Sequence, residues 1–332
     1  MDRRSMFDLP AILDHLEKSS IDANYQAILK GFMERYAEAL RHAPIDLEKQ
    51  KTIVLEFVDA VETQCNAPHH FEPFHKHLPA HQTFGCAFIG PLIDMKQSKI
   101  FGKESLKKIE DYLARGENVV FFSNHQIEAD PHILFTLLKD YPFSKEIIFV
   151  AGERVVLDPL AVPLSLGCNL LCIYSKKYID YPPEKRAEKQ EHNRSTMQIM
   201  REKLSEGGAC IWVAPSGGRD RKSSDGRPQP ATFDAQSIEM FHLIAKKSEK
   251  PVHFFPLSIS AYHILPPPDG IQIALGEKRI AERGPAGIFV GDELDLEVDP
   301  SLPKQEQRNI KAAAVYQIVK DNYDELSRYI EG

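Results

Sequence analysis

The chain of 332 residues lacks any run of about 18 apolar residues, the length that a membrane-spanning helix needs. Its first residues, Met1 to Ser5, run into Asp8 and Asp14, so they are neither the apolar core of a secretion signal nor an acid-poor transit peptide. No basic amphipathic helix is evident either. We therefore expect peripheral membrane contact at most.

Cysteine is scarce and shows no pairing pattern. The five cysteines are an odd number without a C-x-x-C motif, which suits a reducing compartment. Three of them lie in apolar runs and are predicted to be buried free thiols: Cys168, Cys172 and Cys210. Five histidines share a Pro-containing loop but lack the helical H-E-x-x-H spacing, so we predict no metal site among His69, His70, His75, His77 and His81.

Nucleotide-binding signatures are also missing, since the chain has no G-x-x-x-x-G-K-[ST] and no strand-borne G-x-G-x-x-G. With 41 Lys and Arg against 48 Asp and Glu, the formal net charge is −7, which argues against a nucleic-acid partner. Residues 176–227 differ, because they hold 12 Lys and Arg against 8 Asp and Glu. This segment is either a mixed-charge helix with a basic loop or part of a pocket for a small phosphorylated substrate or an anionic carrier.

The composition that remains is that of an ordinary globular protein, 42% hydrophobic and 27% charged. Residues 1–66 show three stripes of apolar residues at helical spacing, and Asp46 is a plausible N-cap for the third helix. Three short stripes bury little by themselves. We predict a small N-terminal helical domain over residues 1–78 that packs on the rest of the chain.

Residues 79–332 alternate short β-branched or aromatic runs with helical segments, which is typical of a mainly parallel sheet covered on both faces. The expected strands are Val119–Ser123, Ile147–Ala151, Asn169–Tyr174, Ala209–Ala214, Val252–Ser258, Ile271–Leu275 and a late strand over Gly287–Leu296. The expected helices are Glu104–Arg115, Pro131–Lys139, Ser195–Ser205, Ala235–Lys247 and a long C-terminal helix. The fold class is therefore α/β, with a mainly parallel, mixed sheet covered by helices and preceded by a small N-terminal helical bundle.

The stretch from Val119 to Pro131 holds the first chemical constellation. A buried strand ends at Ser123, and Asp130 is a predicted helix N-cap, so His125 lies in the turn between them. Open α/β sheets bind ligands at that edge. A carboxylate orients an imidazole and stabilises the imidazolium, so His125 and Asp130 can serve as a general base and its partner. The alternative is that Asp130 is only an N-cap and His125 only a polar turn residue.

Cations follow two later strands. Lys176 and Lys177 come directly after one of them. Arg219 and Arg221 come after another, beyond a glycine pair that begins at Gly217. Glycine lets the backbone approach a ligand, and arginine can bind phosphate oxygens bidentately. Because parallel strands share one carboxyl edge, we expect these cations to gather there.

Ser216 precedes that glycine pair and invites comparison with a Ser-His-Asp hydrolase. The sequence around it, Ala214-Pro215-Ser216-Gly217-Gly218, does not match the nucleophile-elbow pattern G-x-S-x-G. We therefore predict a turn or ligand-contact role for Ser216.

Four blocks of residues follow one another between residues 84 and 262. The first two are Asn124-His125-Gln126-Ile127-Glu128-Ala129-Asp130-Pro131 and Ala151-Gly152-Glu153-Arg154. The other two are Trp212-Val213-Ala214-Pro215-Ser216-Gly217-Gly218-Arg219 and the surroundings of Pro256. Together they resemble the His-x4-Asp glycerolipid acyltransferases, and most of all the soluble glycerol-3-phosphate acyltransferases of plant plastids and certain bacteria. The helical N-terminal segment resembles the plastid type as well.

This resemblance implies acyl transfer from an acyl thioester to the sn-1 hydroxyl of glycerol 3-phosphate, which gives lysophosphatidate in the first step of phospholipid synthesis. The donor would be acyl-carrier protein or coenzyme A, no cofactor would be needed, and residues 79–332 would be the catalytic domain. His125 would be the base and Asp130 its orienting partner. The implied substrate-binding residues are Lys177, Arg219, Arg221, Arg154, Ser216 and Gly217. Plant members carry His where this chain has Tyr178, which can hydrogen-bond a phosphate but supplies no charge.

Two alternatives stay open. A non-catalytic module that binds an acyl carrier or a lipid phosphate would need the cations but not His125 and Asp130. An acyltransferase for another phosphorylated alcohol would share all of these residues. The expected location is the cytoplasm of a bacterium, or the plastid stroma if a transit peptide has been removed.

Overall fold

A mixed sheet forms the centre of the protein. The structure, a computed structural model, describes residues 7–67, 71–176, 179–268 and 275–331. Eight strands within these ranges pair in the order β1-β5-β4-β6-β3-β9-β10-β2. Their bounds are β1 Phe74–His75, β2 Lys99–Phe101, β3 Asn118–Ser123, β4 Ile148–Gly152, β5 Asn169–Ile173, β6 Cys210–Val213, β9 Val252–Ser260 and β10 Gly287–Val290.

Five neighbouring strands of this sheet run parallel: β5, β4, β6, β3 and β9. At the two ends of that block, β1 and β10 pair antiparallel with their neighbours. The carboxyl ends of the parallel strands therefore meet along one edge, where ligands of such sheets bind. A separate ribbon, β7 Arg221–Lys222 with β8 Pro228–Gln229, follows β6 in the chain.

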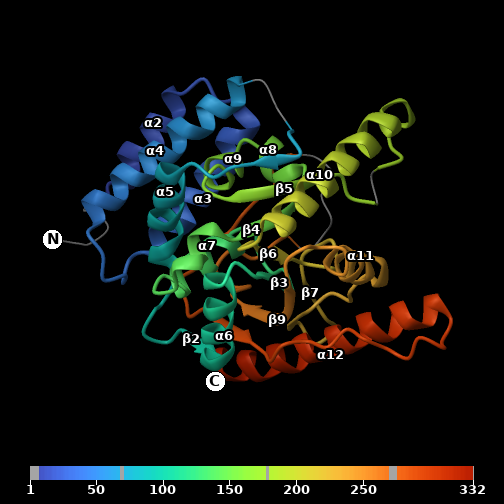
Figure 1. The fold of residues 1–332 in the computed structure, drawn as a ribbon. Helices are drawn as coiled ribbons and strands as arrows, with labels where there is room; N and C mark the ends of the chain where they lie inside the picture. Colours follow the sequence, from blue (N-terminus) through green and yellow to red (C-terminus); the bar gives the residue numbers. More distant parts are fainter. Residues whose placement is uncertain (1–6, 68–70, 177–178, 269–274, 332) are drawn as a thin grey trace.

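Helices cover both faces of the sheet (Figure 1), and the N-terminal helices and the last helix lie at opposite ends of the view. The longer helices are α2 Leu9–Lys18, α3 Ala23–Ala39, α4 Leu47–Asn66, α5 Pro79–Ile89, α6 Lys103–Ala114, α7 Asp130–Leu137, α10 Arg186–Glu206, α11 Ala235–Ala245 and α12 Lys304–Glu331. The shorter ones are α8 Arg154–Leu157, α9 Val162–Ser165, η1 Gly90–Leu92, η2 Pro142–Glu146 and η3 Pro183–Lys185. The expected α/β fold class is confirmed. No helix of the described residues is long and apolar enough to cross a membrane.

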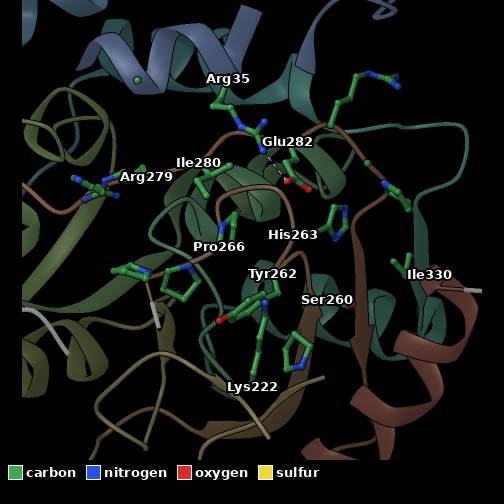
Figure 2. Close-up of a pocket in the computed structure, with 18 of the residues that line it drawn as sticks. Arg35, Lys222, Ser260, Tyr262, His263, Pro266, Arg279, Ile280, Glu282 and Ile330 are labelled. Carbon is green, nitrogen blue, oxygen red and sulfur yellow. Dashed lines mark ion pairs between the residues drawn. The ribbon is translucent and has the colours of Figure 1, made fainter. Parts of the chain in front are cut away.

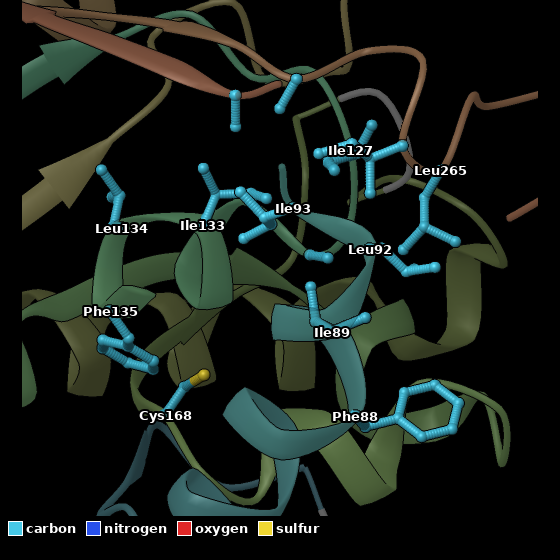
Figure 3. Close-up of a cluster of buried hydrophobic side chains, with 14 of the residues drawn as sticks. Phe88, Ile89, Leu92, Ile93, Ile127, Ile133, Leu134, Phe135, Cys168 and Leu265 are labelled. Carbon is cyan, nitrogen blue, oxygen red and sulfur yellow. The ribbon is translucent and has the colours of Figure 1, made fainter. Parts of the chain in front are cut away.

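Alternate residues of β3 enter two different hydrophobic cores. Val119 and Phe121 belong to the core that also holds α2 to α7, part of which Figure 3 shows. Val120 and Phe122 belong to the second core, with α10, α11 and α12. Both faces of β3 are covered, which fits the continuous apolar run from Val119 to Phe122. Burial of each large apolar side chain contributes about 1.5–3 kcal/mol.

The N-terminal helices begin and dock as their sequence predicts. Asp46 caps α4 by accepting hydrogen bonds from the N–H groups of Glu48 and Lys49, both at 3.1 Å. Tyr36 of α3 is fully buried, and its hydroxyl donates to the carbonyl oxygen of Phe88 in α5. The two rings stack with centroids 5.0 Å apart. The N-terminal helices therefore share a core with α5, and the domain boundary after residue 78 stays a prediction.

Two expected elements differ from those observed, and a third lies almost wholly outside the described residues. Helix α10 begins at Arg186 rather than Ser195, because its first two turns are polar and carry no apolar stripe from which a helix could be predicted. The late strand ends at Val290, where Gly291 and an acidic loop follow. Apart from Leu275, which lies in a bend, the strand expected over Ile271–Leu275 falls outside the described residues.

The three cysteines of the apolar runs are buried and free, as predicted. Burial raises the pKa of the Cys172 thiol to about 12. A neutral thiol of this kind behaves as a small apolar side chain, so these cysteines belong to the core.

Candidate active site

His125 and Asp130 meet across the short turn between β3 and α7. The Nδ1 atom of His125 lies 2.8 Å from Oδ2 of Asp130. The same carboxylate accepts hydrogen bonds from the N–H of Gln126 at 2.8 Å and the N–H of Ile127 at 3.2 Å. A carboxylate can only accept, so His125 donates from Nδ1 and keeps the Nε2 lone pair for a proton.

Asp130 is not the N-cap that we expected. Helix α7 begins at Asp130 itself, and Ala129 is the N-cap residue. The carboxylate points back to the preceding turn, where it accepts hydrogen bonds from the N–H groups of Gln126 and Ile127 and contacts His125. The alternative that Asp130 merely caps a helix is therefore wrong. The N–H groups of Gln126 and Ile127 are also engaged, so they are not free to bind an oxyanion.

The imidazole of His125 is partly open to solvent, with 26% of its side chain exposed. One side is covered by Trp212 of β6, whose ring lies edge-on at a centroid distance of 5.8 Å. Asp130 beneath it has no exposed surface. A ligand can therefore reach Nε2 while water does not reach the carboxylate.

A second buried carboxylate, Asp220, holds the turn in place. Its Oδ2 accepts hydrogen bonds from the side-chain amides of Asn124 at 2.7 Å and Gln126 at 3.3 Å. Its own N–H donates to the carbonyl oxygen of His125 at 2.6 Å. On the other side, the side chain of Asn124 accepts a hydrogen bond from the N–H of Ile259 in β9. The side chain of Gln126 accepts one from the N–H of Ala261, directly after β9. The turn is thus tied to the segment after β6 on one side and to the end of β9 on the other.

Arg219 lies beside this turn and is already paired. Its Nη2 donates to Oε1 of Glu277 at 2.6 Å, and its Nη1 lies 3.6 Å from Oε1 of Glu128. Glu128 also pairs with Arg279. The side chains of Arg219 and Glu277 are 14% and 1% exposed. The charges of two arginines and two carboxylates therefore cancel in a largely buried cluster. Glu128 connects this cluster to the His125 turn.

Arg221 and Ser216 make their hydrogen bonds to backbone carbonyl oxygens outside the His125 turn. Arg221 lies in β7, and its Nη1 contacts the carbonyl oxygen of Pro268 at 3.5 Å. The hydroxyl of Ser216 donates to the carbonyl oxygen of Gly218 at 2.9 Å and closes a turn. Gly217 in that turn has φ of +66°, a conformation that costs other residues about 1–2 kcal/mol. Because Ser216 is not hydrogen-bonded to His125, it is not placed as a hydrolase nucleophile.

Two further phosphate contacts are predicted, Lys177 and Arg154. Lys177 lies outside the described residues, as does Tyr178. Arg154 begins α8 directly after β4, at the same edge of the sheet. Lys176 forms an ion pair with Asp234 at 2.8 Å. The phosphate-binding roles of Lys177 and Arg154 stay predictions.

The histidine-rich loop shows contacts other than metal ligation. His75 and His77 contact oxygens of Leu166 at 3.4 Å and Asn169 at 3.0 Å, while His69 and His70 lie outside the described residues. Among the residues that are described, no group of three or more His, Cys, Asp or Glu side chains could hold a metal ion. The expectation that no metal is required stays a prediction.

Three charged residues of this site have no role predicted from the sequence: Glu128, Asp220 and Glu277. Glu128 follows the predicted base by three positions, and Asp220 stands between the two predicted arginines, so their places in the sequence were a signal for both. Glu277 follows Arg219 by 58 residues. No local pattern predicts that pairing.

The chain is similar to known acyltransferases. The family model described as Acyltransferase matches residues 104–260, which contain the His125 turn and Arg219. A chloroplastic glycerol-3-phosphate acyltransferase of Cucurbita moschata is 38% identical over 314 residues, which cover 90% of this chain and 68% of that protein. One of Arabidopsis thaliana is 34% identical over 344 residues, which cover 100% of this chain and 74% of that protein. One of Spinacia oleracea is 33% identical over 318 residues, with coverages of 92% and 66%.

The chain belongs to the glycerol-3-phosphate acyltransferase family. The resemblance drawn from the four blocks is thereby confirmed, and the protein is an acyltransferase. Acyl transfer to an alcohol needs a base for the hydroxyl proton. The accessible Nε2 of His125, supported by the buried Asp130, has the geometry that such a base needs.

Proposed function

We propose that the protein moves a fatty acyl group from an acyl thioester to the sn-1 hydroxyl of glycerol 3-phosphate and releases lysophosphatidate and a thiol. The observation that supports this best is the His125–Asp130 pair, which leaves Nε2 as an accessible base in the turn beside the largely buried Arg219. The names of the relatives support the same acceptor.

The chemistry needs no acyl-enzyme. Nε2 of His125 takes the proton of the attacking hydroxyl while its oxygen bonds to the thioester carbonyl carbon. The carbon–sulfur bond then breaks, and the imidazolium returns the proton to the leaving thiolate. Asp130 stabilises the imidazolium in between, and general base catalysis of this kind contributes about 10²–10⁴-fold in rate. Every proton is accounted for, and no cofactor takes part.

The acceptor phosphate is proposed to bind Arg219 and Arg221, with Lys177 and Arg154 as further contacts and the Ser216–Gly217 turn beside them. Arg219 is held by Glu277 and Glu128 in the free protein. A phosphate that approaches must share this guanidinium with Glu277. The arginine is thus positioned before binding, which favours one orientation of the glycerol and therefore one hydroxyl.

The acyl donor is proposed to be a fatty acyl thioester of acyl-carrier protein or of coenzyme A. The relatives are named chloroplastic, which supports the plastid stroma as the location over the bacterial cytoplasm. Contact with membranes is proposed to be peripheral at most.

A transfer assay with purified protein tests this proposal. It offers both thioesters as donors, and glycerol 3-phosphate, dihydroxyacetone phosphate and lysophosphatidate as acceptors. We expect turnover with glycerol 3-phosphate above the other two, and a fall of about 10²-fold or more in His125→Ala with substrate binding retained. His42→Ala is the matched control, because His42 is exposed in the loop after α3. If His125→Ala keeps full turnover, His125 is not the base.

The acceptor site is tested by Arg219→Ala in the same assay. Loss of a charged hydrogen bond costs about 1.5–3 kcal/mol, so KM for glycerol 3-phosphate should rise about tenfold or more. A change in the donor KM alone would contradict the assignment of Arg219 to the acceptor phosphate.

A further inference from the structure

A large cationic cavity lies next to the candidate active site but does not contain it. Its volume is about 1100 Å³. Helix α3, the segment after β9, the ribbon residue Lys222 and helix α12 form its walls, as Figure 2 shows for Arg35, Tyr262, Lys222 and Ile330. Neither His125 nor the arginines proposed for the acceptor line it.

Positive charge dominates the lining. It includes five arginines and lysines but one carboxylate, Glu282, and the cations are Arg35, Lys222, Lys278, Arg279 and Arg283. Arg35 lies 3.7 Å from Glu282, and Arg283 pairs with Asp94 outside the cavity at 3.0 Å. Within the described part of the chain, Lys222 and Lys278 have no ion-pair partner.

Arg279 has two hydrogen-bond donors for which no described residue supplies an acceptor. One end of its guanidinium pairs with Glu128. Its Nε and Nη2 atoms are buried, and no described residue accepts a hydrogen bond from either of them. Buried donors without a partner are rare in folded proteins, since each forgoes its hydrogen bond with water. An anion in the cavity would supply the missing acceptors.

The cavity connects to the candidate catalytic turn in two ways. Its lining residues Ser260 and Tyr262 flank Ala261, whose N–H binds the side chain of Gln126 next to His125. Arg279 pairs with Glu128, which belongs to the same turn. A ligand bound here therefore lies alongside the turn that holds His125.

The shape and the remaining lining argue against the small acceptor as the ligand. A volume near 1100 Å³ is at the upper end of cavities that hold ligands the size of drugs or cofactors. Part of the wall is apolar, and it includes Ala27, Ile28, Ile280 and Pro266–Pro268. Cations beside an apolar wall suit a long ligand that carries a phosphate at one end and a neutral arm.

We propose that this cavity binds a phosphate of the acyl donor, namely the phosphopantetheine thioester that coenzyme A and acyl-carrier protein share. The inference rests on the proposed function, because a phosphopantetheine donor has a place here only if the protein is such an acyltransferase. It assigns to α3 of the N-terminal segment a wall of the donor site. It also separates two anion sites, one for the donor on this side of Glu128 and one for the acceptor at Arg219.

Steady-state kinetics of a double variant, Lys222→Ala with Lys278→Ala, test the proposal. Both lysines are exposed, so their removal leaves the fold intact. We expect the donor KM to rise about tenfold or more, as for other charged hydrogen bonds to phosphate, while KM for glycerol 3-phosphate is unchanged. The matched control removes two exposed lysines that do not line the cavity, Lys139→Ala with Lys247→Ala, and should behave as the wild type.

The two donors distinguish the sources of the phosphate. A rise with both thioesters supports the phosphate of the pantetheine arm. A rise with coenzyme A alone would mean that the lysines contact its nucleotide phosphates, which acyl-carrier protein lacks, and this would overturn the proposal of a shared phosphate. A rise with acyl-carrier protein alone would mean that the lysines contact the carrier surface, which overturns the proposal. So would a rise in KM for glycerol 3-phosphate, or no change in any KM.

Direct binding separates failure of this inference from failure of the proposed function. Titration calorimetry with coenzyme A needs no turnover. If the wild type transfers no acyl group to any acceptor, the proposed function fails. Weaker binding of coenzyme A by the double variant than by the control would still support an anion site in the cavity, and equal binding would overturn it.

Discussion

Asp220 organises the candidate site at the scale of single residues. It has no exposed surface and accepts hydrogen bonds from Asn124, Gln126 and the N–H of Ala231. Burial raises its pKa to about 7, although these hydrogen bonds favour the ionised form, and the charge of Asp130 adds to the rise. A group with such a pKa titrates near neutral pH while it holds the turn of the proposed base.

The stability of the fold should therefore depend on the protonation of Asp220. Its pKa in the folded protein lies above the ordinary value of 3.8. Protonation thus stabilises the fold fully below about pH 4, and this contribution is lost as the pH rises from about 4 to 7. Relative to Asp220→Asn, whose amide does not titrate, the free energy of unfolding of the wild type should fall by about 1.4 kcal/mol per pH unit in this window.

Urea unfolding of both proteins at several pH values measures this difference. The comparison between the two proteins cancels the other titrating groups. A difference that stays constant between about pH 4 and 7 would mean that Asp220 is ionised throughout, and that its three donors outweigh its burial.

At the scale of elements, the start of α6 depends on a glycine. Gly102 precedes α6 with φ of +79°, and an added Cβ would lie 1.8 Å from the carbonyl oxygen of Val290 in the neighbouring strand β10. The chain passes from β2 to α6 at this point. No other residue type fits without movement of one of the two elements.

Gly102→Ala should therefore destabilise the protein by more than about 1–2 kcal/mol, the cost of the left-handed conformation alone. Gly31→Ala is the matched control. Gly31 lies inside α3, and its added Cβ would meet no atom within 4 Å. This control should raise the free energy of unfolding by about 0.5–1 kcal/mol. Chemical denaturation measures both, and equal effects of the same sign would contradict the explanation.

At the scale of the whole molecule, the N-terminal helices and the sheet share one hydrophobic core. Met33 of α3 and Phe121 of β3 belong to the same cluster of buried side chains. Trp212, the single tryptophan of the chain, lies in β6 of that cluster. The fluorescence of Trp212 therefore measures unfolding of the sheet. Trp212 is well separated in the sequence from the N-terminal helices, so it does not measure their unfolding directly.

Met33→Ala should destabilise both parts together. Truncation of a buried Met costs about 2–5 kcal/mol, and Met33 has no exposed surface. We expect Trp212 fluorescence and helical circular dichroism to shift to lower denaturant by the same amount. If the dichroism shifts while the fluorescence transition stays in place, residues 1–78 unfold as an independent unit.

Much of the fold and part of the site could be predicted from the sequence, because both depend on local order. The buried parallel strands are continuous apolar runs, and their helices carry apolar stripes or caps such as Asp46. His125 and Asp130 are five positions apart across one turn, so their meeting follows from a strand that ends before a helix. The direction of the Asp130 side chain could not be predicted. A helix N-cap and a partner of His125 both require a carboxylate at this position, so the sequence is the same in the two cases.

Contacts between distant segments were decided by the tertiary structure alone. Asp220 reaches Asn124 across 96 positions, and Arg219 reaches Glu277 across 58. The cationic cavity forms only where α3, the segment after β9 and α12 come together. Sequence patterns encode which faces are apolar and where elements end. The choice of a partner for each buried charge depends on which strands become neighbours, and that is set by the packing of the whole chain.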